Sequence, residues 1–338
     1  MRKSKGTVAG MALLACAVLA GATACNDSAS AAAGSAASAG AASGTPSAGS
    51  GTASGTSSPS ASASPSPTHP SGPPMQLESI TPATGATVGV AMPVSVVFSH
   101  AVAASARAGV EQHLKVTTSV PTTGSWHWYP GGTRVDWRPE NYWTPGTQVS
   151  VDADLTDVPD GNGRYGTHAY HHSFTIGADF ETFVSVTGHS MVVKSDGKVV
   201  RTMPIDAGSP DFPSWDGTMA VIDKEPTVRM TSCSVGISCD KNSPNYYDLT
   251  LPWDVHLTYS GTYVHYSTGD PYPGHSYGSH GCVHLSLADS KWYYSHVKQG
   301  DPVTITGSPR GKAAPDNGYA AFNLSWAQWQ AGSALNGQ

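Results

Sequence analysis

Residues 26–75 most constrain what this chain can fold into, because they carry almost no side chains that could form a core. The segment consists mainly of Ala, Gly, Ser, Thr and Pro, contains Asp27 as its only carboxylate, and has no Lys or Arg. Such a composition buries too little apolar surface to offset the entropy of ordering the chain. We therefore expect a disordered linker here, and a fold built from residues 76–338, which contain all nine Trp and could form two domains of ordinary size.

The first 25 residues have the pattern of a signal peptide for export. Arg2, Lys3 and Lys5 precede an apolar run over residues 8–24, which is too short and too rich in small residues for a comfortable membrane span. Cys25 follows small residues at the expected cleavage site, an arrangement that resembles the lipobox of bacterial lipoproteins. We expect an exported protein, held in the cell wall at the outer face of the cytoplasmic membrane by lipid on Cys25; the alternative is ordinary cleavage near Ala24.

The charge balance of the chain is acidic. The formal net charge is −6, and removal of the basic residues of the signal peptide would make the exported chain more acidic still. Such a chain lacks the positive patch with which proteins bind nucleic acid. We expect no nucleic-acid partner.

Residues 76–177 show the alternation of a β domain. Apolar and polar residues alternate over 94–98, 149–155 and 170–176, and this period of two predicts half-buried strands. Turns that contain Gly and Pro separate these strands at the spacing of an all-β sandwich. We predict an Ig-like domain, in which the absence of cysteine leaves no disulfide between the sheets.

Three histidines of this region, His168, His171 and His172, could suggest a metal site. On an alternating strand His171 and His172 point to opposite faces. Packed or rim histidines are therefore the better interpretation.

Residues 178–308 also have the pattern of strands, with a hairpin turn at residues 195–198 (SDGK). One helix is predicted before the C-terminal segment. Ser286 begins a sequence similar to a capping box, Trp292 and His296 are one helical turn apart, and Gly300 ends the helix.

The five cysteines divide by compartment. Cys16 and Cys25 belong to the export segment, whereas Cys233 and Cys239, six residues apart, can pair in an oxidising exterior. Cys282 is then the odd thiol, within residues 279–284 (SHGCVH) and 17 residues after His265. A thiol, an imidazole that can take its proton, and a glycine that lets main-chain N–H groups approach an oxyanion are what thiolate catalysis requires.

Two other interpretations of this block remain open on the residues alone. An extended strand would direct His280, Cys282 and His284 to one side, as zinc ligands can be arranged. The third interpretation is an inert buried cysteine beside histidines that face solvent.

Residues 263–265 (YVH) and 279–283 (SHGCV) resemble the signature of the L,D-transpeptidase catalytic domain of the YkuD type. Residues 242–247, 259–261 and 296–301 and a Trp-containing tail extend the similarity to the actinobacterial cell-wall type, in which an Ig-like domain precedes the catalytic one. The resemblance implies a mainly β fold: an Ig-like β-sandwich over 76–177, then a β-rich catalytic domain over 178–308 with one or two short helices.

The resemblance also implies the roles of the catalytic residues. Cys282 would be the nucleophile and His265 the general base, oriented by the main-chain carbonyl of Tyr266. The main-chain N–H groups of Gly281 and Cys282, with His280, would form the oxyanion hole.

The substrate-binding residues implied by the resemblance are Tyr247, Met230, Ser279 and His284. Tyr247 would belong to a flap over the site, and Met230 to the same flap. Two features depart from the family pattern: His284 stands where the family often has Asn or Arg, and the Cys233/Cys239 pair lies in the flap.

The implied activity is that of a peptidoglycan L,D-transpeptidase. Cys282 would attack the third residue of a tetrapeptide stem, release D-alanine and form a thioester, which an amine of a second stem converts into a 3→3 cross-link. Carbapenem β-lactams are expected to acylate Cys282, and neither a metal nor an organic cofactor is implied. The alternatives are an L,D-carboxypeptidase that uses water, and a wall-binding adaptor whose catalytic domain has decayed.

Trp326 and Trp329 lie in the C-terminal segment 309–338. Their spacing predicts a short helix that docks an aromatic face, and we expect the segment to dock on the catalytic domain. An aromatic platform that binds sugar is the alternative.

Overall fold

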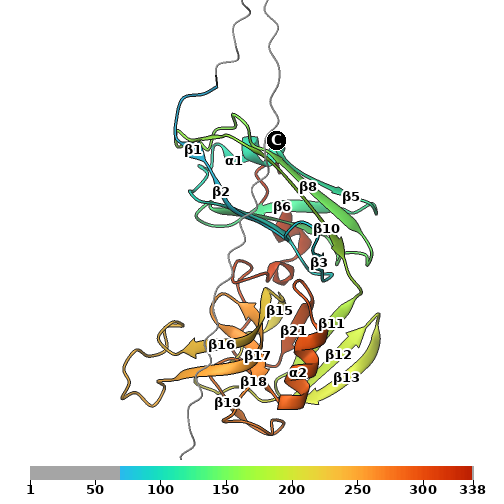
Figure 1. Cartoon of the computed structure of the whole chain (residues 1–338), viewed down its shortest axis with the longest axis vertical. Coiled ribbons are helices and arrows are strands. Elements are labelled where there is room, and N and C mark those ends of the chain that lie inside the picture. The colour runs from blue at the N-terminus through green and yellow to red at the C-terminus, as the bar shows by residue number, and fades with distance from the viewer. Residues whose placement is uncertain (1–68, 337–338) are drawn as a thin grey trace, which may run out of the picture. The chain divides into compact units, whose positions relative to one another are not determined.

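The computed structural model describes residues 69–336, which are mainly β, as predicted (Figure 1). The predicted signal peptide, the lipidation site at Cys25 and most of the predicted linker lie outside the described residues. No helix within residues 69–336 is long and apolar enough to cross a membrane.

The first part of the described chain is a β-sandwich. One four-stranded sheet has the order β3-β10-β8-β5, the other has the order β2-β4-β7-β6, and β1 pairs with β9. The elements are β1 (Pro74–Met75), β2 (Leu77–Thr81), β3 (Thr87–Val88), β4 (Val94–Phe98), α1 (Arg107–Gln112), β5 (Leu114–Thr118), β6 (Gly124–Trp128), β7 (Arg134–Pro139), β8 (Gln148–Asp154), β9 (Tyr165–Gly166) and β10 (Ala169–Ile176). The predicted strands are confirmed as β4, β8 and β10.

The alternation of β8 explains how this sandwich forms. Its burial alternates strictly along Gln148–Asp154, and Val149 and Val151 join Val94 and Val96 of β4 in one hydrophobic core. Successive side chains of a strand point to opposite faces, so the alternating apolar residues all lie on one face of the sheet, and this face is buried.

The histidines of β10 do not form a metal site. His171 Nδ1 lies 2.7 Å from Asp152 Oδ1 on an exposed face, and His172 Nδ1 donates to the carbonyl of Pro82 at 3.3 Å. Within residues 69–336, no group of three or more His, Cys, Asp or Glu side chains is placed to hold a metal ion.

The second part contains a five-stranded sheet of order β13-β12-β11-β21-β15, a four-stranded sheet of order β16-β17-β18-β20, and the pair β14-β19. Its elements are β11 (Phe180–Ser185), β12 (Ser190–Ser195), β13 (Lys198–Pro204), β14 (Ala207–Gly208), β15 (Gly217–Ala220), β16 (Asp223–Thr231), β17 (Asp248–Thr258), β18 (Thr262–Tyr266), β19 (Tyr277–Ser279), β20 (Val283–Leu285), α2 (Leu287–His296), β21 (Pro302–Thr306), η1 (Ala321–Asn323) and α3 (Trp326–Gln330).

The predicted hairpin turn and the predicted start of the helix are both present in this part, and local sequence explains each of them. Asp196 and Gly197 have φ values of 49° and 75°, the left-handed conformation that a tight hairpin turn requires. Helix α2 begins at Leu287. Ser286 is its N-cap residue, and the Ser286 side chain accepts a hydrogen bond from the main-chain N–H of Asp289. The helix ends at His296, where the chain turns extended, four residues before Gly300.

The C-terminal segment contacts both parts of the described chain, so our expectation that it docks on the catalytic domain was incomplete. Asn323 Oδ1 accepts from the main-chain N–H of Thr218 on β15 at 2.8 Å. Trp329 of α3 is fully buried; its Nε1 donates to the carbonyl of Ser125 on β6 at 2.8 Å, and its ring stacks on His127 at 4.5 Å. The helix packs there because β6 offers a main-chain acceptor for the indole and a flat ring beside it.

Candidate active site

Two parallel strands bring the predicted catalytic residues together. Strand β18 pairs with β20 so that Val264 lies opposite Val283 and His265 lies opposite His284. Cys282 immediately precedes β20, one position before Val283, and therefore lies close to His265 on the neighbouring strand. Both side chains line one cavity of about 540 Å³.

The His265 side chain is held as a single tautomer. It is 2% exposed, and its Nδ1 donates to the carbonyl of Tyr266 at 2.8 Å. The proton on Nδ1 leaves a lone pair on Nε2. Burial, assisted by the neighbouring His284, lowers the pKa of His265 to about 3, so the ring is neutral at pH 7.

The Cys282 thiol is also neutral. The residue is 9% exposed, and burial raises its pKa to about 12. Its Sγ donates to the carbonyl of Gly261 at 3.6 Å. The site thus holds a thiol and a neutral imidazole, and not a thiolate and an imidazolium.

A glycine and a serine shape the turn before Cys282. Gly281 has a φ of 112°, which residues with a side chain rarely adopt. Ser279 Oγ accepts from the Gly281 N–H at 3.1 Å and donates to the Cys282 carbonyl at 2.6 Å. Ser279 therefore fixes the turn, and its hydroxyl is bonded to the Gly281 N–H that we predicted for the oxyanion hole.

The three residues that could have bound zinc make separate contacts. His280 packs between the rings of Phe212 and Tyr247, with centroids 4.7 Å and 5.0 Å away. His284 Nδ1 lies 2.9 Å from Asp270 Oδ2, while Cys282 bonds to the main chain. They do not form a ligand set.

The long hairpin of β16 and β17 supplies the flap residues. Met230 of β16 pairs in register with Leu249 of β17, and Tyr247 comes directly before β17. Met230 and Tyr247 both line the cavity. Burial, with the nearby Cys282, raises the pKa of Tyr247 to about 12. The remaining lining residues are Leu249, Leu251, His265, Ser267, Gly269, Asp270, Pro271, Tyr272, His275, Ser276, Gly278, Ser279, His280, Cys282 and His284.

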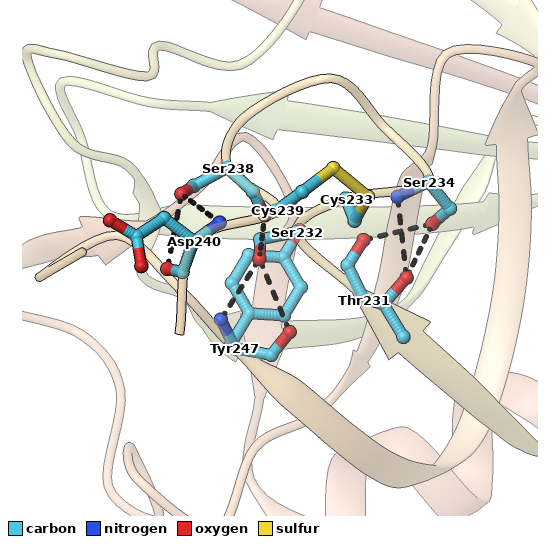
Figure 2. Close-up of a disulfide and its surroundings, with 8 residues drawn as sticks. All are labelled: Thr231, Ser232, Cys233, Ser234, Ser238, Cys239, Asp240 and Tyr247. Carbon is cyan, nitrogen blue, oxygen red and sulfur yellow. Dashed lines mark hydrogen bonds between the residues drawn. A yellow bond between two sulfur atoms is a disulfide. The ribbon is translucent and has the colours of Figure 1, made fainter. Parts of the chain in front are cut away.

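The predicted disulfide between Cys233 and Cys239 is present and closes the loop beside Tyr247 (Figure 2). Ser232, next to Cys233, uses its Oγ to accept from the Tyr247 N–H at 3.1 Å and to donate to the Ser238 carbonyl at 2.7 Å. The Ser232 N–H also donates to the Tyr247 carbonyl at 3.0 Å. The disulfide loop therefore anchors the main chain of Tyr247.

Sequence reasoning missed two acidic residues beside the site, Asp270 and Asp206. Asp270 lies in residues 269–271 (GDP), which predict only a turn. Asp206 is an isolated carboxylate between β13 and β14. Their proximity to His284 depends on the pairing of segments that are distant in sequence, and no local pattern signals it.

Comparisons with known proteins identify the family of both parts of the chain. Residues 50–159 match the bacterial Ig domain, and residues 179–305 match the L,D-transpeptidase catalytic domain. L,D-transpeptidase 1 of Mycobacterium tuberculosis is 36% identical over 243 residues, which are 70% of this chain and 88% of that protein. L,D-transpeptidase 2 of the same species is 33% identical over 272 residues, which are 80% of this chain but only 64% of that protein.

Solved structures show the same similarity. The LD transpeptidase LdtMt1 in complex with imipenem superimposes with a TM-score of 0.59 at 34% identity, over 69% of this chain and 100% of that one. L,D-transpeptidase 3 from Mycobacterium tuberculosis, in complex with a faropenem-derived adduct, has a TM-score of 0.56 at 30% identity, over 68% of this chain and 98% of that one.

Proposed function

Because the chain belongs to the L,D-transpeptidase family, we propose that it transfers the acyl group of a peptidoglycan stem tetrapeptide to a second stem through a thioester on Cys282. One observation carries the proposal: the buried Cys282 and His265 line one cavity, and Tyr266 holds His265 in the tautomer whose Nε2 can accept a proton. The alternative with water as acceptor is an L,D-carboxypeptidase.

The neutral state of Cys282 and His265 determines when the thiol proton moves during formation of the thioester. With the pKa of Cys282 near 12 and that of His265 near 3, a free thiolate is rare at pH 7. The thiol proton therefore moves to His265 Nε2 as sulfur attacks the carbonyl carbon of the third stem residue. The bond to D-alanine then breaks, and the amine of D-alanine takes the proton from His265.

The main chain before β20 supplies the oxyanion donors. Ser279 holds the N–H of Gly281, so the N–H groups of Cys282 and His280 are the donors that we assign to the developing oxyanion. Such groups stabilise charge that appears only in the transition state.

The same family relation leads us to retain the export hypothesis. The chain would reach the outer face of the membrane and be held there through lipid on Cys25. An N-terminal peptide from the membrane fraction whose mass includes a diacylglyceryl group would support this, whereas an unmodified terminus near Ala24 would refute it.

The test of the activity uses a stem tetrapeptide that contains diaminopimelate, as both donor and acceptor. Wild type should release D-alanine and form a dimer joined through two third residues, and Cys282→Ala should do neither. Release of D-alanine without dimer would establish the carboxypeptidase. Neither product from folded wild type would refute both activities and favour a wall-binding adaptor.

A further inference from the structure

The cavity contains a second imidazole that thioester formation does not use. His284 lines the cavity, and the exposed fraction of its side chain is 12%. Its ring centroid lies 4.9 Å from that of His265, at an interplanar angle of 69°. A substrate group that reaches Cys282 and His265 therefore passes close to His284.

His284 is oriented by a carboxylate. Its Nδ1 donates to Asp270 Oδ2 at 2.9 Å. Burial, together with the charge of Asp206, raises the pKa of Asp270 to about 6, which still leaves a carboxylate at pH 7. This acceptor holds the proton on Nδ1 and leaves a lone pair on Nε2, which has no hydrogen-bond partner within residues 69–336.

Asp206 connects the strand of His284 to the loop of Asp270. Its main chain exchanges two hydrogen bonds with that of His284, at 2.8 Å and 3.3 Å. Its buried carboxylate accepts hydrogen bonds from the loop that follows Asp270, and the donors are the main-chain N–H groups of Gly274, His275 and Ser276 and the hydroxyl of Ser276. Burial opposes ionisation of Asp206, but these hydrogen bonds lower its pKa to about 2. Hydrogen bonds of Asp206 thus hold together the two segments that carry His284 and Asp270.

The charge of the cavity favours a cationic group. Asp270 is the only Asp, Glu, Lys or Arg among the lining residues. Burial lowers the pKa of His284 to about 4, although Asp206 opposes this effect, so the ring is neutral and Nε2 can only accept a hydrogen bond. An ammonium or amine has the N–H donors that such a nitrogen binds, and a carboxylate has none.

We propose that His284, positioned by Asp270, is a second general base, which takes the proton of the amine that resolves the thioester. This inference rests on the proposed transpeptidase function and names the residue that acts on its acceptor. Asp270 would orient the imidazole of His284 and stabilise its protonated form, as the carboxylate of a Ser-His-Asp triad does for its histidine.

The step balances without any further reactant. An acceptor ammonium loses one proton to solvent, its nitrogen forms a bond to the thioester carbonyl carbon, and a second proton passes to His284 Nε2. The C–S bond breaks with its electron pair on sulfur, and the Cys282 thiolate takes up one proton. His284 then returns its proton to solvent, so that an amide, a thiol and a neutral imidazole remain.

The test separates acylation from resolution of the thioester. Acylation is measured as the rate at which a carbapenem forms an adduct on the full exported chain, a reaction that needs no acceptor. Resolution is measured as dimer formation from the tetrapeptide. We expect His284→Asn to form dimer about 100-fold more slowly than wild type, which is the range of general base catalysis, and to lose a much smaller factor in acylation.

Three further variants distinguish a base from a packing residue. Asp270→Asn should slow dimer formation less than His284→Asn does, because the base remains but loses its orienting charge. His284→Ala should recover dimer formation when imidazole is added, which a packing role would not produce. His171→Asn, which alters the exposed pair of His171 and Asp152 in the first domain, should behave as wild type.

The pH dependence gives an independent readout. The titratable groups around His284 are Asp270, Asp206 and His265, with His280 acting on its pKa and His189 lying 3.5 Å from Asp206. Dimer formation by wild type should fall on acidification as His284 takes up a proton, and His284→Asn should lose that part of the profile.

Two results would overturn the assignment: dimer formation that is unchanged in His284→Asn, or acylation and dimer formation that fall by the same factor. Failure of wild type to form an adduct or to release D-alanine would instead refute the proposed function, and with it the inference.

Discussion

At the scale of single residues, the site depends on burial of groups that are kept uncharged. His265 and Cys282 face one cavity, and desolvation moves their pKa values away from pH 7 in opposite directions. The sequence predicted both residues, since an unpaired cysteine and a histidine are visible in it. The sequence could not predict their protonation states, because these arise from the closed packing of β18 against β20.

The buried His265 should make the protein sensitive to acid. Its pKa is about 3 in the folded state against 6.5 for the ordinary group, so between these values the unfolded chain binds more protons than the folded one. The free energy of unfolding should therefore fall as pH decreases from about 6.5 towards 3. Chemical denaturation at a series of pH values measures this slope, and His265→Gln should show a shallower one. Parallel curves for the two proteins would contradict the buried neutral state.

At the scale of elements, the patterns with a local cause were predictable, and the contacts of Asp206 with Asp270's loop and with His284 were not. The alternation of β4, β8 and β10, the hairpin turn at Asp196 and Gly197, and the cap of α2 each depend on neighbours in sequence. The support that Asp206 gives to Asp270 and His284 requires a loop and two strands to meet. Its residues carry no periodicity that could predict it.

The disulfide loop of the flap should contribute to both stability and acylation. Replacing Cys233 and Cys239 together with Ser removes the constraint of a short loop, which is worth about 2 kcal/mol in a chain-entropy treatment. It also loosens Ser232 and hence Tyr247. We expect a lower midpoint of thermal unfolding and acylation by a carbapenem that is slower by about 3- to 10-fold. Wild-type acylation in the double variant, with stability lowered, would show that the loop does not position Tyr247 for the reaction.

At the scale of the whole described chain, the C-terminal segment connects the first sandwich to the catalytic sheet. Arg134 of β7 donates to the carbonyl of Gly318 at 2.9 Å. Arg138, also of β7, lies 4.9 Å from the ring of Trp329. The sequence predicted a helix with a docking aromatic face. The surface on which this helix docks is formed by β6 and β7, so the sequence of the helix alone could not predict it.

Trp329 should carry much of the stability of this connection. Truncation of a fully buried Trp typically costs about 3–5 kcal/mol, so Trp329→Ala should lower the free energy of unfolding by about that amount. The half-buried Trp326 is the matched control, and Trp326→Ala should cost clearly less. Equal losses in the two variants, measured by denaturant unfolding, would contradict the packing described for α3. Loss of wall binding at unchanged stability would favour a sugar platform instead.

The proposed mechanism requires Cys282 to carry the acyl group. The most direct measurement is an acid quench of the exported chain during turnover of the stem tetrapeptide, followed by intact mass and peptide mapping. We predict a tripeptide acyl group on the peptide that contains Cys282, labile to hydroxylamine and absent from Cys282→Ala, with one D-alanine released for each adduct formed. Continued release of D-alanine by Cys282→Ala, or an acyl group mapped to another residue, would refute the thioester mechanism.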